Sequence, residues 1–183
     1  MTRSSFLRNR QGSSIVEFSI IAPVLALIFA GTADIGAVLL KRFQLNDTLS
    51  AAANFALVSQ ANVSSTKGPA LAAALTGIVS GTGATHYADS LAVVNNGPSS
   101  KVAAGVTTTP TGTASNADLC YCPTRTTTLV WGTSVACGYA CPSGLRGGKF
   151  IQLTASKAHT ALFGNYGIVS NGTVSVSALI QVQ

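Results

Sequence analysis

The sequence predicts an α+β protein, in which a long N-terminal transmembrane helix precedes a small, disulfide-bonded and mainly antiparallel β domain. Residues 15–40 are almost all apolar, the last third of the chain alternates apolar and polar residues, and the four cysteines form two close pairs. We therefore expect a basic leader at 1–12, a helix at 13–62 that includes the span, and a domain outside the membrane at 63–183.

The leader, MTRSSFLRNRQG, carries three of the positive charges that give the chain its formal net charge of +6. The basic residues beyond it are scattered along the chain. Nucleic-acid binding needs a stripe of basic residues, often with interleaved aromatic ones. Charged residues make up only 9% of the chain, against about 25% in an ordinary soluble domain. We expect no nucleic-acid partner, and a surface suited to packing against a membrane or against other copies.

The apolar run at 15–40 is long enough to span a bilayer. As a helix it would measure roughly 39 Å, whereas the hydrocarbon core is about 30 Å thick. The alternative is a cleaved secretory signal, whose apolar part covers only about 7–15 residues and ends at a small-residue cleavage site. The run is longer than that and has no convincing site at its end, which favours a retained span.

The orientation of this span follows from charge and from the cysteines. Arg3, Arg8 and Arg10 precede the span, whereas Lys41 and Arg42 follow it. The positive-inside rule narrowly favours a cytoplasmic N-terminus. Disulfides persist outside the cytoplasm, so the cysteines support a periplasmic domain.

Beyond residue 40, apolar residues continue at a spacing of three to four, which predicts that the first helix extends to about Gln60. Pro23 removes one backbone hydrogen bond and is a possible kink. A second, short helix is expected over 69–79, with its proline in the first turn, and glycines at 81–83 end it.

The remaining chain predicts strands. Short apolar pieces at 91–94 and 102–106 are candidate strands within a Thr- and Ser-rich segment, and better patterns occupy 126–131, 149–158 and 173–182. The last run alternates apolar and polar residues, as a half-buried strand does. We expect residues 150–153 to pair with it across the loop at 164–167.

The cysteines predict two disulfides. They occur as Cys120 with Cys122 and as Cys137 with Cys141, an even number outside the cytoplasm. Zinc is the alternative, but only the second pair has the spacing of a zinc knuckle. A bridge within the first pair would be strained, so we expect bridges between the pairs. A nested order, 122 with 137 and 120 with 141, suits antiparallel flanks, although sequence does not determine it.

No catalytic set is apparent. His86 and His159 are far apart in sequence, and Asp89 near His86 is typical of a polar surface loop. No nucleophile, base and orienting group occur together. We expect no enzyme activity, no cofactor and no metal.

Two carboxylates interrupt the apolar helix. Asp34 is expected at the outer interface near Lys41 and Arg42. Glu17 lies one turn inside the apolar run, where a carboxylate is costly and usually functional or paired. The plainer interpretation is an acidic residue at headgroup level, favoured in a helix's first turn.

The N-terminal segment resembles TadE-like proteins, the minor pilins or pseudopilins of the bacterial Tad (Flp-type) pilus. The resemblance is carried by RQGSSIVEF at 10–18, IAPVL at 21–25 and GTADIG at 31–36. Members typically have a basic stretch, a Gly, then Glu-Phe or Glu-Tyr, followed by an apolar helix with Pro and an acidic residue near its end. The cysteine segment and the ending FGNYG and TVSVSALIQVQ look similar too, although Gln181 replaces the usual basic residue.

This resemblance implies a minor pilin or assembly component of an adhesive pilus, anchored in the bacterial inner membrane and able to enter the filament. It implies cleavage after Gly12, so that Ser13 begins the mature chain and Glu17 and Phe18 are its fifth and sixth residues, with assembly roles. The implied partners are other major and minor pilins, a prepilin peptidase and the inner-membrane assembly platform. The alternative is a signal-anchored envelope domain that binds a ligand or senses a stimulus, without cleavage.

Overall fold

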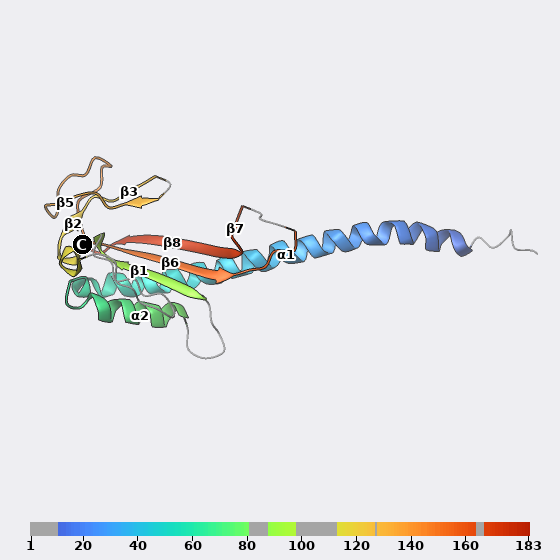
Figure 1. The fold of residues 1–183 in the computed structure, drawn as a ribbon, viewed down its shortest axis with the longest axis horizontal. Helices are drawn as coiled ribbons and strands as arrows, with labels where there is room; N and C mark the ends of the chain where they lie inside the picture. Colours follow the sequence, from blue (N-terminus) through green and yellow to red (C-terminus); the bar gives the residue numbers. More distant parts are fainter. Residues whose placement is uncertain (1–10, 81–87, 98–112, 127, 164–166) are drawn as a thin grey trace, which may run out of the picture.

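The structure is a computed structural model that describes residues 11–80, 88–97, 113–126, 128–163 and 167–183. Its longest element is α1, Gln11–Val58, a continuous helix of 48 residues with Pro23 inside it. One half of α1 packs in the domain and the other half projects from it alone (Figure 1). The expected long helix is therefore confirmed, and a short 3-10 turn, η2 at Gln60–Asn62, follows it.

A four-stranded antiparallel sheet forms the centre of the domain, in the order β1-β6-β8-β7. Its strands are β1 at Ser90–Asn95, β6 at Phe150–Ala158, β7 at Val169–Ser170 and β8 at Thr173–Gln181. β6 and β8 pair along their whole length, from Phe150 opposite Gln181 to Ala158 opposite Thr173. The expected strands at 91–94, 149–158 and 173–182, and the pairing of the last two, are confirmed.

The alternation in β8 has the predicted consequence. Val174 and Val176 are buried, while Ser175 and Ser177 between them are exposed. A two-residue turn joins β7 to β8, and both of its residues have positive φ, 50° at Asn171 and 71° at Gly172. Asn-Gly with this geometry is the turn that best matches the twist of a hairpin.

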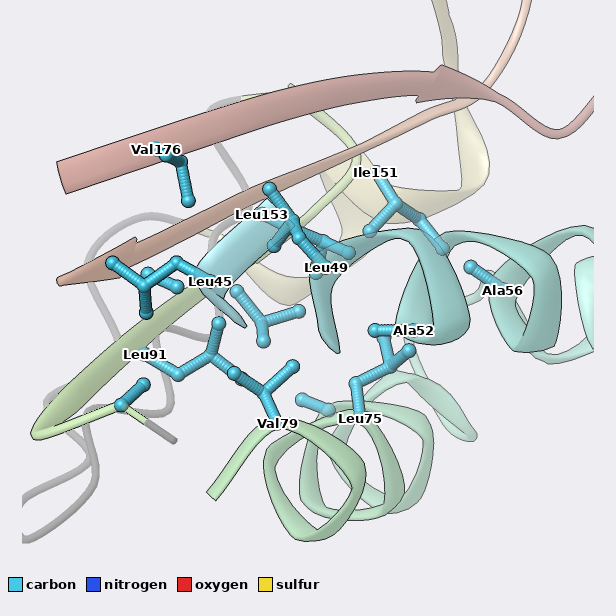
Figure 2. Packing of buried hydrophobic residues seen from close by; sticks show 14 of the residues in the cluster. Leu45, Leu49, Ala52, Ala56, Leu75, Val79, Leu91, Ile151, Leu153 and Val176 are labelled. Atoms are coloured by element: carbon cyan, nitrogen blue, oxygen red, sulfur yellow. The ribbon is translucent and has the colours of Figure 1, made fainter. Parts of the chain in front are cut away.

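The core lies between one face of this sheet and two helices, α1 and α2, the latter at Gly68–Ser80. Figure 2 shows Leu45, Leu49 and Ala52 of α1 packed between the sheet and α2, where Leu75 and Val79 face them. The second helix is confirmed. Since α1 covers β8 and β6 while α2 covers β1, the latter half of α1 belongs to the core of the domain.

A small disulfide-bonded lobe lies at the end of the domain remote from the projecting helix (Figure 1). It follows the 3-10 helix η4 at Ala114–Asp118. It contains two short antiparallel pairs, which are β2 at Cys120–Tyr121 with β5 at Ser134–Val135, and β3 at Thr124–Arg125 with β4 at Leu129–Val130.

The strand expected over 126–131 is present only as the two residues of β4. Thr124 pairs with Val130 and Arg125 with Leu129, so the run begins in a turn, where Thr126 N–H donates to the Thr128 carbonyl at 3.3 Å. Strand pairing within this run is confined to its apolar part, Leu129–Val130. The hairpin-like excursion expected between the cysteine pairs is present.

Several expectations lie outside the described residues. They are the leader up to residue 10, the end of the second helix at 81–83, His86, the candidate strand at 102–106, and most of the loop at 164–167.

Candidate functional site: the apolar helix and its junction with the domain

The projecting half of α1 is apolar, and no other described part of the protein covers it. The helix contains an 18-residue window of mean hydropathy 2.1, none of which is buried. Large apolar side chains on all its sides are exposed, among them Phe18 at 67%, Leu27 at 60% and Phe29 at 71%. Fully burying one such side chain stabilises by about 1.5–3 kcal/mol, so this surface needs an apolar environment. The helix is consistent with a single-pass membrane anchor.

Two hydroxyl side chains within this stretch are satisfied by the helix itself. Ser19 Oγ donates to the Val16 carbonyl at 2.7 Å, and Thr32 Oγ1 donates to the Phe29 carbonyl at 3.0 Å. Such bonds to the preceding turn leave no hydroxyl hydrogen unsatisfied in hydrocarbon. Proline is tolerated in spans for the related reason that local adjustments can satisfy the freed carbonyl.

The predicted processing and assembly residues lie at the beginning of α1. Gly12 and Ser13 belong to its first turn, and Glu17 and Phe18 follow one turn later with exposed side chains. This arrangement places the carboxylate of Glu17 on the apolar projecting segment. Cleavage after Gly12 and the assembly roles of Glu17 and Phe18 stay predictions.

Asp34 has a different environment from the expected one. Its side chain is buried, and its Oδ1 atom lies 3.2 Å from Nε2 of His159, which is also buried. Its Oδ2 atom accepts the Leu162 N–H at 2.9 Å. The burial of Asp34 was not expected, and it arises because the chain that follows β6 folds over this carboxylate and supplies its partners.

Lys41 completes this contact from two turns farther along α1. Its Nζ atom donates to the Ala158 carbonyl at 3.0 Å and lies 3.2 Å from Nδ1 of His159. An ammonium group can only donate, so Nδ1 is the acceptor and Nε2 carries the proton that reaches Asp34. The chain Lys41–His159–Asp34 thus joins the end of β6 to α1 where the helix leaves the domain.

The cysteines form both bridges between the two pairs, as expected. Cys120 bonds to Cys137 and Cys122 to Cys141, with Cα atoms 5.2 and 5.6 Å apart, which is ordinary disulfide geometry. No free cysteine occurs among the described residues.

The order of the bridges is not the nested one that antiparallel flanks suggested. The β2–β5 register places Cys120 opposite Val135, close to Cys137. The chain then reverses, with Gly138 at φ 83° and Tyr139 N–H bonded to the Ala136 carbonyl at 3.0 Å. This reversal brings the second cysteine of the later pair back to Cys122. Sequence spacing did not reveal the turn, although Gly138 is its natural marker.

Two polar residues that sequence reasoning missed connect the lobe to the rest of the domain. Asn96, fully buried, donates to the carbonyls of Ala117 and Leu119 at 3.0 and 2.6 Å and accepts the Phe150 N–H at 3.0 Å. Its position directly after an apolar strand and before a glycine was the available signal.

Asp118 is the second of these residues. Its Oδ1 atom accepts the Ser65 N–H at 3.0 Å, which ties η4 to the segment between the helices. Hydrogen bonds from the Ser65 side chain and backbone, aided by the positive charge of Lys149, hold the pKa of Asp118 below its ordinary value.

His159 is the main functional candidate that sequence reasoning left without a role. Its separation from Asp34 by 125 residues hid the pair. No group of three or more metal-binding side chains occurs among the described residues.

These features define the class of the protein: an α+β domain with two disulfides, carried on one long helix whose apolar half is consistent with a membrane anchor. The family model of TadE-like proteins matches residues 12–54. This segment lies wholly within α1, and over it the chain is similar to TadE-like proteins. No curated protein and no solved structure matches the chain.

Proposed function

We propose that the protein is a minor pilin or pseudopilin, or a related assembly component, of a Tad/Flp-type adhesive pilus. The observation that carries this proposal is the TadE-like match over a helix whose outer half exposes apolar side chains on all sides. Such a helix can exchange lipid for neighbouring pilin helices without changing its own fold. The role is structural rather than enzymatic.

The proposed orientation has the N-terminus in the cytoplasm and the domain in the periplasm. The two disulfides support it, since such bonds form and persist in oxidising compartments. The leader's three arginines support it as well. The proposed partners are other major and minor pilins and the inner-membrane assembly platform, which the apolar half of α1 would contact, together with a prepilin peptidase.

Processing after Gly12 is the direct test of the pilin role. Co-expression with an active prepilin peptidase of a Tad system should give a mature chain that begins at Ser13, as measured by N-terminal sequencing and intact mass. A Gly12→Leu variant is the matched control and should stay uncut. Recovery of only uncut wild-type chain would reject the processed pilin and leave an anchored envelope protein.

A further inference from the structure

The chain that follows β6 exposes two large apolar side chains beside the apolar helix. Leu162 is 71% exposed and Phe163 is 49% exposed. Their position along α1 is set by the hydrogen bond from Leu162 N–H to Asp34 and by the contact of His159 with the same carboxylate. Figure 1 shows this end of the sheet lying beside α1, at the point where the helix begins to project alone.

This position coincides with a membrane boundary if the helix spans the bilayer. From Ile15 to Asp34 the helix rises about 30 Å at 1.5 Å per residue, which equals the thickness of the hydrocarbon core. Leu162 and Phe163 would then lie at the periplasmic edge of the hydrocarbon. Large apolar side chains in that position are stabilised by transfer from water to hydrocarbon, as are the apolar side chains of the helix.

An open apolar groove continues from this loop down the helix. It has a volume of about 510 Å³ and is lined by Phe163 and by Leu27, Ile28, Gly31 and Ile35 of α1. Space is free at Gly31, where an added Cβ atom would meet nothing within 4 Å. The groove is therefore part of the surface that faces the apolar phase, and not a pocket of the periplasmic domain.

Positive charges lie on the other side of the loop. Lys41 and Arg42 follow Asp34 by about two helical turns, or roughly 10–12 Å along the axis. Arg42 is exposed, whereas Lys41 is held at the end of β6 by its bond to the Ala158 carbonyl. Along the axis of α1, apolar side chains are thus followed by cationic ones. In a lipid leaflet, acyl chains are followed by phosphates in the same order.

We propose that Leu162 and Phe163 insert into the periplasmic leaflet of the membrane that α1 crosses, with an acyl chain in the groove and lipid phosphates near Lys41 and Arg42. The inference rests on the proposed membrane anchoring. It adds a second, separate membrane contact, which would hold the domain against the bilayer instead of leaving it free on the helix.

The test uses tryptophan as a depth probe in the full chain, reconstituted in vesicles of phosphatidylcholine and phosphatidylglycerol with or without bromine on the acyl chains. The chain has one tryptophan, Trp131, in the lobe remote from the membrane. The Trp131→Phe variant removes this tryptophan and serves as the parent chain for the probes. Phe163→Trp places the probe in the loop, and Leu162→Trp replaces it if that variant fails to fold. Leu25→Trp places a reference probe within the span.

We expect the emission of Phe163→Trp to be blue-shifted and quenched by brominated lipid, to an extent comparable with Leu25→Trp, while Trp131 in the wild type is not quenched. Quenching of Leu25→Trp without quenching of the loop probe would overturn the inference and leave the anchor intact. A blue shift without quenching would also overturn it, since a second copy would then cover the loop. Absence of quenching at both probes would reject the anchoring itself.

Discussion

At the scale of single residues, the acidic side chains are held in three different environments. Glu17 lies on the exposed apolar helix, Asp34 is buried under the end of β6, and Asp118 is exposed and bonded to Ser65. Burial of a carboxylate is costly unless charges or hydrogen bonds compensate it. Asp34 and Asp118 both obtain their hydrogen bonds from distant segments, the chain after β6 and the segment between the two helices.

Changing Glu17 to Gln should reduce pilus incorporation without harming membrane insertion. After cleavage, Ser13 carries a positively charged α-amine about one turn away, on the same chain or a neighbour, and pairing in a low-dielectric setting rewards one axial register between helices. Membrane fractionation and co-purification with pili separate the two steps. Asp47→Asn, an exposed acid on the same helix, is the control, and normal incorporation of the Glu17 variant would show that its charge is merely tolerated.

Changing His159 to Ala should destabilise the domain by about 1.5–3 kcal/mol, because it removes one hydrogen-bond donor from a buried carboxylate. The Leu162 N–H would continue to donate to Oδ2 of Asp34. Thermal unfolding in detergent, followed by near-UV circular dichroism, measures the loss. Asp34→Asn in the same chain should recover part of it, so independent, additive effects of the two changes would contradict the pairing.

Asp118 should contribute to the pH dependence of stability. Its folded pKa is lowered by the bonds from Ser65, so its contribution is present above the unfolded pKa and is lost as pH falls through the folded one. Between about pH 5 and pH 3 the denaturation midpoint of Asp118→Asn should therefore fall less steeply than that of the wild type. Asp47→Asn is again the control, and parallel curves for wild type and Asp118→Asn would refute the assignment.

At the scale of elements, the bridges substitute for a core in the lobe. Its paired strands are only two residues long, and such short pairs are marginal in water on their own. The bridges close chain segments with separations of 17 and 19 residues, for which each is expected to contribute about 2–4 kcal/mol. Because the two closed segments overlap, their contributions should not add fully.

Reduction of the disulfides should therefore unfold the lobe before the four-stranded sheet. The sheet has its own buried cluster, to which the four cysteines do not contribute. Hydrogen exchange of the reduced protein should show faster exchange at residues 120–148 and retained protection in β6 and β8. Equal loss of protection in both regions would show that the lobe and the sheet unfold as one unit.

Elements with regular patterns were predictable from the sequence, and tertiary connections were not. The alternation of Val174, Val176 and Ala178 predicted β8, and the apolar run at 150–153 predicted its partner strand. The turn at Gly138 and the pairing of Asp34 with His159 depend on which segments meet in space. Neither hydrophobic periodicity nor residue spacing predicts such tertiary contacts. The order of the disulfides and the buried Asp34–His159 pair were therefore not predicted.

At the scale of the whole molecule, α1 is both the proposed anchor and part of the core. Leu45 is fully buried and Leu49 nearly so, whereas Ile15 and Phe18 on the same helix are mostly exposed. A rigid helix shared by the membrane and the domain transmits its position directly to the sheet. Pulling or packing the apolar half would therefore move the domain as one body, which suits a subunit inserted into a filament.

The dual role of α1 predicts which truncations fold. A chain that begins at Ala33 keeps Asp34, Val38 and the helix face that covers β8 and β6. It should remain monomeric, with the cooperative unfolding and near-UV signal of the full protein in detergent. A chain that begins at Val63 loses the α1 face of the core, including Leu45 and Leu49, and leaves the apolar side of the sheet uncovered.

Burying large aliphatic side chains contributes about 1.5–3 kcal/mol each, and ordinary domains are stable by only about 5–15 kcal/mol. The shorter chain should therefore aggregate or lack a fixed tertiary signal when both are produced in the periplasm, where their disulfides can form. Size-exclusion chromatography and circular dichroism compare the two directly. Cooperative folding of the chain that begins at Val63 would show that α1 is an anchor only, and that the domain is complete without it.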